Sequence, residues 1–128
     1  MIFEAMIVDD EAPARVELSS QLARTGRVQV VDEAVCLQEA IAKLHKRGID
    51  VVFIDHNIAG SGTNLLAQAM ESMEYKPMLI YMTAFSDYQD DPFGIEPLGY
   101  LVKPVDNERL AEVIGLIEAH EFSKVARS

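Results

Sequence analysis

The chain has 128 residues, a length typical of one domain, with 49% hydrophobic and 25% charged residues. This balance excludes a disordered or collagen-like chain, and a single cysteine excludes a disulfide-stapled scaffold. A formal net charge of −10 without a long basic cluster argues against direct binding of nucleic acid. The apolar runs are shorter than the roughly 20 residues of a membrane helix, and no signal peptide is evident, so we expect a cytoplasmic location.

The first part of the chain is predicted to form a strand, a helix and a second strand. The continuous apolar run at residues 3–8 is typical of a strand buried on both faces. Pro13 follows, and proline is favoured in the first turn of a helix. A more alternating run at residues 28–31 predicts the second strand. The apolar side of the predicted helix consists of Val16, Leu18 and Leu22.

The middle of the chain continues this alternation. Apolar runs at residues 51–54 and 78–82 predict two more buried strands. One helical stripe precedes the first of these runs, and another lies between the two. The stripes consist of Leu37, Ala40, Ile41 and Leu44, and of Leu65, Leu66, Ala69, Met70 and Met73.

The last part of the chain predicts a fifth strand and a final helix. The apolar run at residues 98–102 marks the strand, and Asp106 or Asn107 is expected to cap the helix after it. Pro92 interrupts the segment between the fourth and fifth strands, so any helix there should be short or distorted. The apolar side of the final helix consists of Leu110, Val113, Ile114 and Ile117.

This alternation predicts the fold class. Strands that alternate with helices imply right-handed crossovers and a parallel sheet covered on both faces. We therefore expect one α/β domain over residues 1–128. Ligands of such sheets bind beyond the carboxyl ends of the strands, which is where chemistry is expected.

Polar residues collect where the predicted strands end. Asp9 and Asp10 follow the first strand, and the later strands end in Asp55, Thr83 and Lys103. Each residue alone would be interpreted as a solvated loop position, and Asp9 and Asp10 could simply cap the helix that follows. In a parallel sheet, however, all of them meet at one edge, where clustered carboxylates repel unless a cation such as Mg²⁺ binds. Carboxylate, cation, lysine and hydroxyl are what phosphoryl transfer onto an aspartate requires.

Four segments, at residues 6–11, 51–55, 81–84 and 99–104, resemble the receiver domain of bacterial two-component response regulators. The resemblance covers essentially the whole chain. The stretch from Thr83 to Val105, which includes Tyr88 and Phe93, is most similar to receivers of the LytTR-output subfamily. The resemblance implies a flavodoxin-like, doubly wound (βα)5 fold with a five-stranded parallel sheet in the order 2-1-3-4-5.

The resemblance also implies a role for each residue at this edge. Asp55 would be the phosphoacceptor, and Thr83 and Lys103 would contact phosphoryl oxygens. Tyr100 would turn inward when Thr83 is drawn to the phosphoryl group. The peptide between Lys103 and Pro104 is expected to be cis. The ligands of Mg²⁺ would be Asp9, Asp10, Asp55 and the backbone carbonyl of Asn57.

By the same resemblance, the protein would be a signalling switch in a phosphorelay. Its partners would be a sensor histidine kinase or phosphotransfer protein, and an output domain or downstream protein, with no nucleic acid or membrane bound by this chain. It would catalyse its own phosphorylation and dephosphorylation without being an enzyme in the usual sense. Phosphorylation would change the surface formed by the fourth helix, the fifth strand and the fifth helix.

Two stretches depart from the family pattern. After Asp55, Ala59 and Thr63 stand where such receivers commonly have proline and glycine, and the glycines of residues 60–62 indicate a shortened, mobile loop. Residues 90–94 indicate a distorted fourth helix. These departures motivate a second hypothesis, a pseudo-receiver that acts as a phosphorylation-independent interaction module. The retained acids, threonine and lysine of the edge argue against it.

Two other functions fit the sequence less well. An aspartate-nucleophile phosphatase of the dehalogenase type needs an acid two residues after its nucleophile, where this chain has Asn57. A dinucleotide-binding domain needs a glycine-rich turn after the first strand. Here the acids of residues 9–11 would repel a pyrophosphate.

Overall fold

A five-stranded parallel sheet forms the centre of the computed structural model, which describes residues 1–84 and 92–126. The strand order is β2-β1-β3-β4-β5, and every neighbouring pair is parallel. The predicted fold class and strand order are therefore confirmed. The strands are β1 (Phe3–Val8), β2 (Val28–Ala34), β3 (Val51–Asp55), β4 (Met78–Thr83) and β5 (Gly99–Val102).

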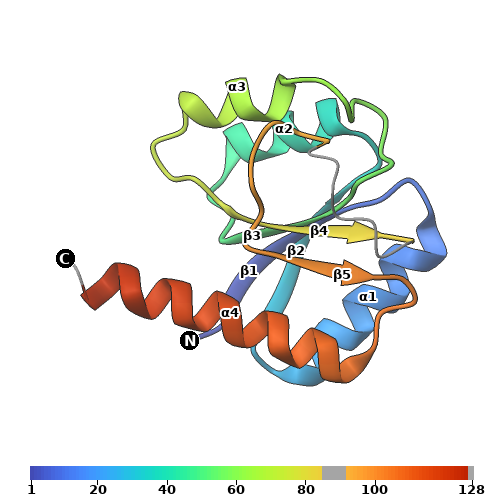
Figure 1. The fold of residues 1–128 in the computed structure, drawn as a ribbon, viewed down its shortest axis with the longest axis vertical. Helices are drawn as coiled ribbons and strands as arrows, with labels where there is room; N and C mark the ends of the chain where they lie inside the picture. The colour runs from blue at the N-terminus through green and yellow to red at the C-terminus, as the bar shows by residue number, and fades with distance from the viewer. Residues whose placement is uncertain (85–91, 127–128) are drawn as a thin grey trace.

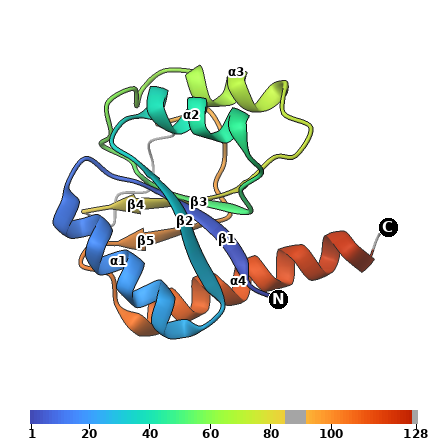
Figure 2. The same cartoon turned by 180° about the vertical axis from the view of Figure 1, so that it is seen from behind.

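Helices cover both faces of the sheet (Figure 1). One face carries α1 (Ala12–Thr25) and α4 (Asn107–Ala126), and the other carries α2 (Leu37–Lys46) and α3 (Leu65–Glu71), as the reverse view in Figure 2 also shows. The last helix, expected as the fifth, is thus α4. No helix among the described residues is both long and apolar enough to cross a bilayer.

The described part of the connection from β4 to β5, residues 92–98, differs from a regular strand–helix–strand unit. Residues 92–98 form turns and bends rather than a helix. Pro92 at the start of this stretch is consistent with that, because proline removes a helical hydrogen bond. The predicted distorted helix otherwise falls on Tyr88, Asp90, Asp91 and their neighbours, which lie outside the described residues.

Side-chain alternation along the strands creates two cores. Phe3 and Ile7 of β1 pack with α1 and α4, whereas Met6 and Val8 pack with α2 and α3. All four side chains are at most 2% exposed. Because both faces of the sheet are covered, the central strands β1, β3 and β4 carry apolar residues at most positions, which explains the apolar runs in the sequence.

The predicted apolar side of α1 is wrong at Val16. Leu18 and Leu22 are buried as predicted, but Val16 is 69% exposed. The buried side includes Gln21 instead. Residues three and four apart share a helix face, so Leu18, Gln21 and Leu22 lie together, while Val16 is two positions from Leu18 and points away.

The other helices follow the predicted stripes more closely. The predicted residues of α2 and α4 face the cores. In α3, Leu66 and Met70 are buried, but Leu65 is 40% exposed and Met73 lies beyond the end of the helix. The side chain of Asp106 accepts a hydrogen bond from the Glu108 backbone N–H at 2.8 Å, so Asp106 is the cap of α4.

The loop after β3 packs closely against α2. Gly60 and Gly62 have φ angles of 104° and 81°, values that favour glycine. A Cβ atom on Gly60 would lie 2.7 Å from the Cβ atom of Leu37. The Leu37 N–H also donates to the Ala59 carbonyl at 3.0 Å. The loop is therefore attached to α2, and the mobility expected from its glycines stays a prediction.

Gly60→Ala should lower the free energy of unfolding by about 1–3 kcal/mol, because a side chain at positive φ is strained and would collide with Leu37. Gly115→Ala is the matched control, since this helical position has open space around it. The control should raise stability by about 0.5–1 kcal/mol. Urea unfolding followed by circular dichroism measures both changes, and equal losses would contradict the packing argument.

Candidate functional site

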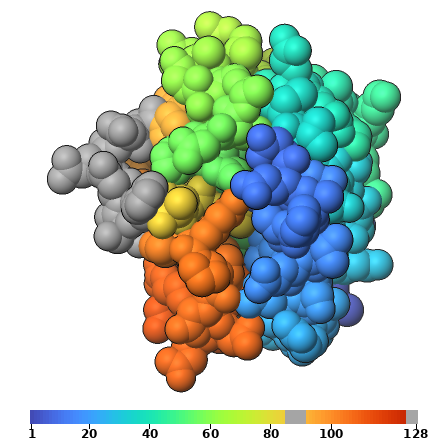
Figure 3. Space-filling view, turned by 90° about the vertical axis from the view of Figure 1, so that its right-hand side faces the viewer, coloured from blue at the N-terminus to red at the C-terminus, as the bar shows by residue number. Residues whose placement is uncertain are grey.

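The carboxyl ends of β1, β3, β4 and β5 meet at one edge of the molecule. Figure 3 looks onto this edge, where the chain after β1 (blue), the loop after β3 (green), the end of β4 (yellow) and the chain after β5 (orange) lie beside one another. Asp9, Asp55 and Thr83 are buried here, with 1%, 7% and 2% exposure. Gln21 is the fourth buried polar side chain among the described residues, so buried polarity is concentrated at the predicted site.

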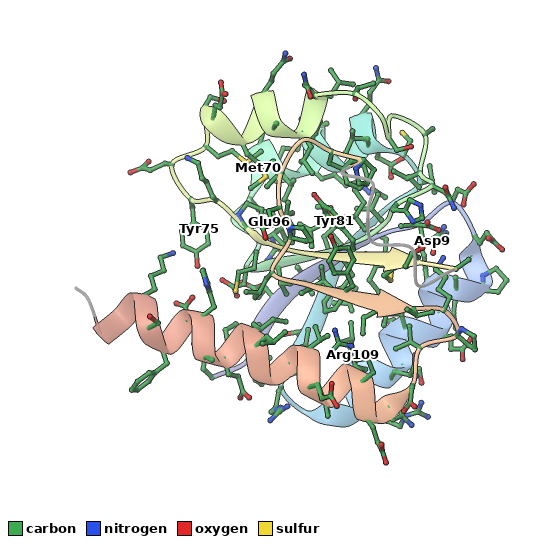
Figure 4. The ribbon with its side chains drawn as sticks, viewed as in Figure 1. Asp9, Met70, Tyr75, Tyr81, Glu96 and Arg109 are labelled. Atoms are coloured by element: carbon green, nitrogen blue, oxygen red, sulfur yellow. The ribbon has the colours of Figure 1, made fainter. Side chains whose placement is uncertain are left out.

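Lys103 connects two of the predicted carboxylates. Its Nζ atom lies 2.6 Å from Oδ2 of Asp9 and 2.7 Å from Oδ2 of Asp55. In Figure 4, Asp9 lies at the carboxyl end of the sheet, near the start of α1. The peptide between Lys103 and Pro104 is cis, as the resemblance implied. The structure therefore brings together three residues that are far apart in the sequence.

A backbone hydrogen bond fixes the second oxygen of each carboxylate. Oδ1 of Asp9 accepts the Glu11 N–H at 2.9 Å, and Oδ1 of Asp55 accepts the Asn57 N–H at 2.9 Å. Both contacts close a turn two residues after the acid, a common role of aspartate. Each carboxylate is thus held at one oxygen by the backbone and at the other by Lys103.

Opposing effects act on the pKa of Lys103. Partial burial lowers it, but the hydrogen bonds and charges of Asp55 and Asp9 outweigh this, so that the pKa lies above its ordinary value. Lys103 is consequently charged at neutral pH. One ammonium faces three acids when Asp10 is included, and the edge keeps an excess of negative charge.

The acids are arranged as a divalent cation site requires. One carboxylate oxygen each from Asp9, Asp10 and Asp55 lies within 4.8 Å of the others. Asp10 is exposed, so the cluster opens to solvent. Hard oxygen ligands with excess negative charge fit Mg²⁺, which keeps several waters and takes few protein ligands. The Asn57 N–H donates a hydrogen bond to the Asp55 side chain. Ligation of the metal by the Asn57 carbonyl stays a prediction.

The backbone positions Thr83 next to Lys103. The Lys103 N–H donates to the Thr83 carbonyl at 2.7 Å, and Thr83 pairs with Val102 across β4 and β5. Tyr100 lies on β5 and is half-buried, with its ring 5.9 Å from the ring of Tyr81. The predicted hydroxyl donor and the predicted switch aromatic therefore lie on adjacent strands, and Thr83 is hydrogen-bonded to Lys103 through the backbone.

Two residues that support the site were missed by the sequence analysis. Arg15 donates to the Asp9 carbonyl at 2.7 Å, and nothing in the sequence distinguishes it from other polar positions of the helix. Gln21 donates to the Val105 carbonyl at 2.8 Å and to Asn107 at 3.1 Å. A polar residue within an apolar stripe was the available signal for Gln21. Arg15 thus holds the backbone of Asp9, and Gln21 holds the chain that follows Lys103 and Pro104.

A doubly wound parallel sheet with clustered aspartates and a lysine at its carboxyl edge defines a class of signalling domain. The sequence profile of the response regulator receiver domain matches residues 5–115. The chain belongs to this family of two-component signalling domains, which are not enzymes in the usual sense.

Several relatives carry names that agree with the predicted subfamily. The chain is 30% identical over 124 residues to the sensory transduction protein LytT of Bacillus anthracis, covering 97% of this chain and 50% of LytT. It is 32% identical over 120 residues to LytR of Staphylococcus haemolyticus, covering 94% and 46%. An uncharacterised response regulatory protein of Vibrio cholerae is 36% identical over 124 residues, covering 95% and 52%. The chain spans about half the length of these relatives.

Solved receiver structures share the fold. The response regulatory domain of mrkE from Klebsiella pneumoniae superposes with a TM-score of 0.76 at 25% identity, covering 91% of this chain and 96% of that one. The REC domain of AraT, a response regulator from Geobacillus stearothermophilus, also gives 0.76, at 28% identity and with 97% and 99% covered.

Lys103→Met should lower the free energy of unfolding by about 2–3 kcal/mol at low salt, because it leaves two buried carboxylates without their counter-charge. Lys43→Met is the matched control, since Lys43 pairs with Glu39 and Asp32 at the surface. Its loss should cost less than about 1 kcal/mol. Urea unfolding of both variants tests this, and a larger loss for Lys43→Met would refute the expectation.

Proposed function

We propose that this domain is a phosphoacceptor switch in which Asp55 receives a phosphoryl group in a Mg²⁺-dependent reaction. The observation that supports this most is that Asp55 contacts Lys103 and lies in one carboxylate cluster with Asp9 and Asp10. Family membership supports the same conclusion. The acid cluster and the lysine supply both the nucleophile and the charges that phosphoryl transfer onto a carboxylate requires.

The proposed reaction is an in-line displacement at phosphorus. A carboxylate oxygen of Asp55 forms a bond to the phosphorus of a phosphohistidine, carried by a histidine kinase or a phosphotransfer protein. The P–N bond breaks, its electron pair leaves with the imidazole, and the imidazole then takes a proton from solvent. Lys103 neutralises one phosphoryl oxygen of the acyl phosphate product, and the Thr83 hydroxyl donates to another.

The metal would be held by the side chains of Asp9, Asp10 and Asp55 and the carbonyl of Asn57. When bound, Mg²⁺ neutralises charge on the transferring phosphoryl group. Asp10 is suited to ligation because it is exposed and lies within the carboxylate cluster. Lys103 already contacts Asp9 and Asp55, so it limits the negative charge that the cluster carries before a cation binds.

The proposed output is a change of surface. When Thr83 moves to the phosphoryl group, Tyr100 turns inward, and the surface of β5, α4 and the connection before β5 changes. An output domain or a downstream protein would read this change. The greater length of the LytT and LytR relatives supports an attached output domain in the full protein.

Phosphorylation at Asp55 is testable by intact-mass spectrometry. Incubation with acetyl phosphate and Mg²⁺ should add one phosphoryl group to the protein, and Asp55→Ala should abolish the addition. Asp32→Ala is the matched control, because Asp32 pairs with Lys43 and contributes no oxygen to the carboxylate cluster, and this variant should be labelled like the wild type. If the folded wild type takes no label, the pseudo-receiver hypothesis gains support instead.

Mg²⁺ should stabilise the unphosphorylated protein. A ligand that binds the folded state alone raises the melting temperature, so millimolar Mg²⁺ should shift the thermal transition upward. Asp10→Asn should remove most of this shift. Glu11→Gln is the matched control, since Glu11 is the adjacent acid but contributes no oxygen to the carboxylate cluster. An unchanged Mg²⁺ response in Asp10→Asn would locate the metal elsewhere.

A further inference from the structure

Residues 92–98 take their path from hydrogen bonds with other parts of the chain. This stretch is not helical, so an internal helical ladder does not fix its backbone. The Gly62 N–H donates to the Pro92 carbonyl at 2.6 Å, and the Leu98 N–H donates to the Leu79 carbonyl at 2.8 Å. Between these two anchors, the Tyr81 hydroxyl donates to the Ile95 carbonyl.

Tyr81 is enclosed by aromatic rings. Its side chain is 1% exposed and lies on the α2–α3 side of the sheet, between β4 and the connection to β5 (Figure 4). The ring of Phe93 meets it edge to face at 5.1 Å, and the ring of Tyr100 does so at 5.9 Å. Tyr81 thus contacts the predicted switch residue with its ring and the connection with its hydroxyl.

We propose that Tyr81 is a positioning residue that couples the orientation of Tyr100 to the path of residues 92–98. This inference rests on the proposed function, because Tyr100 turns only if the switch operates. When the Tyr100 ring leaves its edge-to-face position, the packing around the Tyr81 ring must adjust, since close-packed interiors rearrange rather than deform smoothly.

The hydroxyl of Tyr81 carries this adjustment to the backbone. A buried hydroxyl that loses its partner incurs a desolvation cost, so the Ile95 carbonyl follows the ring. Glu96 comes next in the chain and is exposed, and it extends from the connection in Figure 4. A movement that starts at a buried aromatic ring therefore reaches the surface within one residue.

Volume alone does not account for a tyrosine at this position. Phenylalanine would fill the same space and keep both ring contacts. What tyrosine adds is the bond to the Ile95 carbonyl, which fixes the middle of a stretch whose ends are fixed by Gly62 and Leu79. Replacing Tyr81 by phenylalanine thus removes the hydrogen bond without creating a cavity, so the effect of the bond can be measured apart from the effect of ring packing.

Tyr81→Phe tests the coupling in the full 128-residue chain. Backbone amide chemical shifts are recorded with and without beryllofluoride and Mg²⁺, which mimic the phosphoryl group. In the wild type, shifts are expected around Asp55 and also at the amides of residues 93–96 and 98. In Tyr81→Phe, the shifts around Asp55 should remain and those at residues 93–96 and 98 should be lost.

Tyr75→Phe is the matched control. Its hydroxyl also donates to a partner, Oδ1 of Asp50 at 3.0 Å, but at the opposite end of the sheet. This variant should respond like the wild type at every position. A merely structural role of Tyr81 would change the resting spectrum and the melting temperature of Tyr81→Phe without removing its response at residues 93–96 and 98.

The remaining outcomes overturn the inference in distinguishable ways. A full response of residues 93–96 and 98 in Tyr81→Phe, or a wild type that responds only around Asp55, rejects the coupling and leaves the proposed function intact. A wild type that responds nowhere rejects the proposed function together with the coupling. Failure of Tyr81→Phe to fold would assign the hydroxyl to folding, which also rejects the inference.

Discussion

The ammonium of Lys103, shared by Asp9 and Asp55, is the interaction on which the carboxyl edge of this domain depends. Lys103 follows β5, Asp9 follows β1 and Asp55 is the last residue of β3, and β4 lies between β3 and β5 in the sheet. Three strand spacings of about 4.8 Å separate β5 from β1, so the loops after these strands and a long side chain must together bring Lys103 to the carboxylate of Asp9. Lysine supplies a long side chain together with the charge.

This interaction differs from the other ion pairs of the domain in its burial. Arg27 pairs with Glu118, and Arg47 with Glu4, through side chains that are between 41% and 44% exposed. Such pairs contribute little to stability, because water and salt screen them. The Asp9 side chain is 1% exposed, so its charge has little access to water and depends on the protein for compensation. The two buried carboxylates therefore share one lysine as their local counter-charge, and together with the exposed Asp10 they leave the edge negatively charged.

The sheet and the position of the site could be predicted because simple geometry determines both. Continuous apolar runs follow from strands covered on two faces, and parallel strands bring residues as distant as Asp9 and Lys103 to one edge. Contacts that depend on how one element packs against another could not be predicted from the sequence. The exposure of Val16 and the burial of Gln21 depend on which side of α1 meets the sheet. The attachment of Ile95 to Tyr81 depends on a connection without regular periodicity.

The contact between Arg109 and the Tyr100 carbonyl has a consequence for solubility. β5 is a terminal strand of the sheet, and unpaired backbone groups on such a strand invite pairing with strands of other molecules. The Arg109 guanidinium donates to the Tyr100 carbonyl at 3.1 Å while it also binds Glu112. An incoming strand would have to displace this charged side chain. The same arginine that fastens the start of α4 to the sheet thus protects its margin from aggregation.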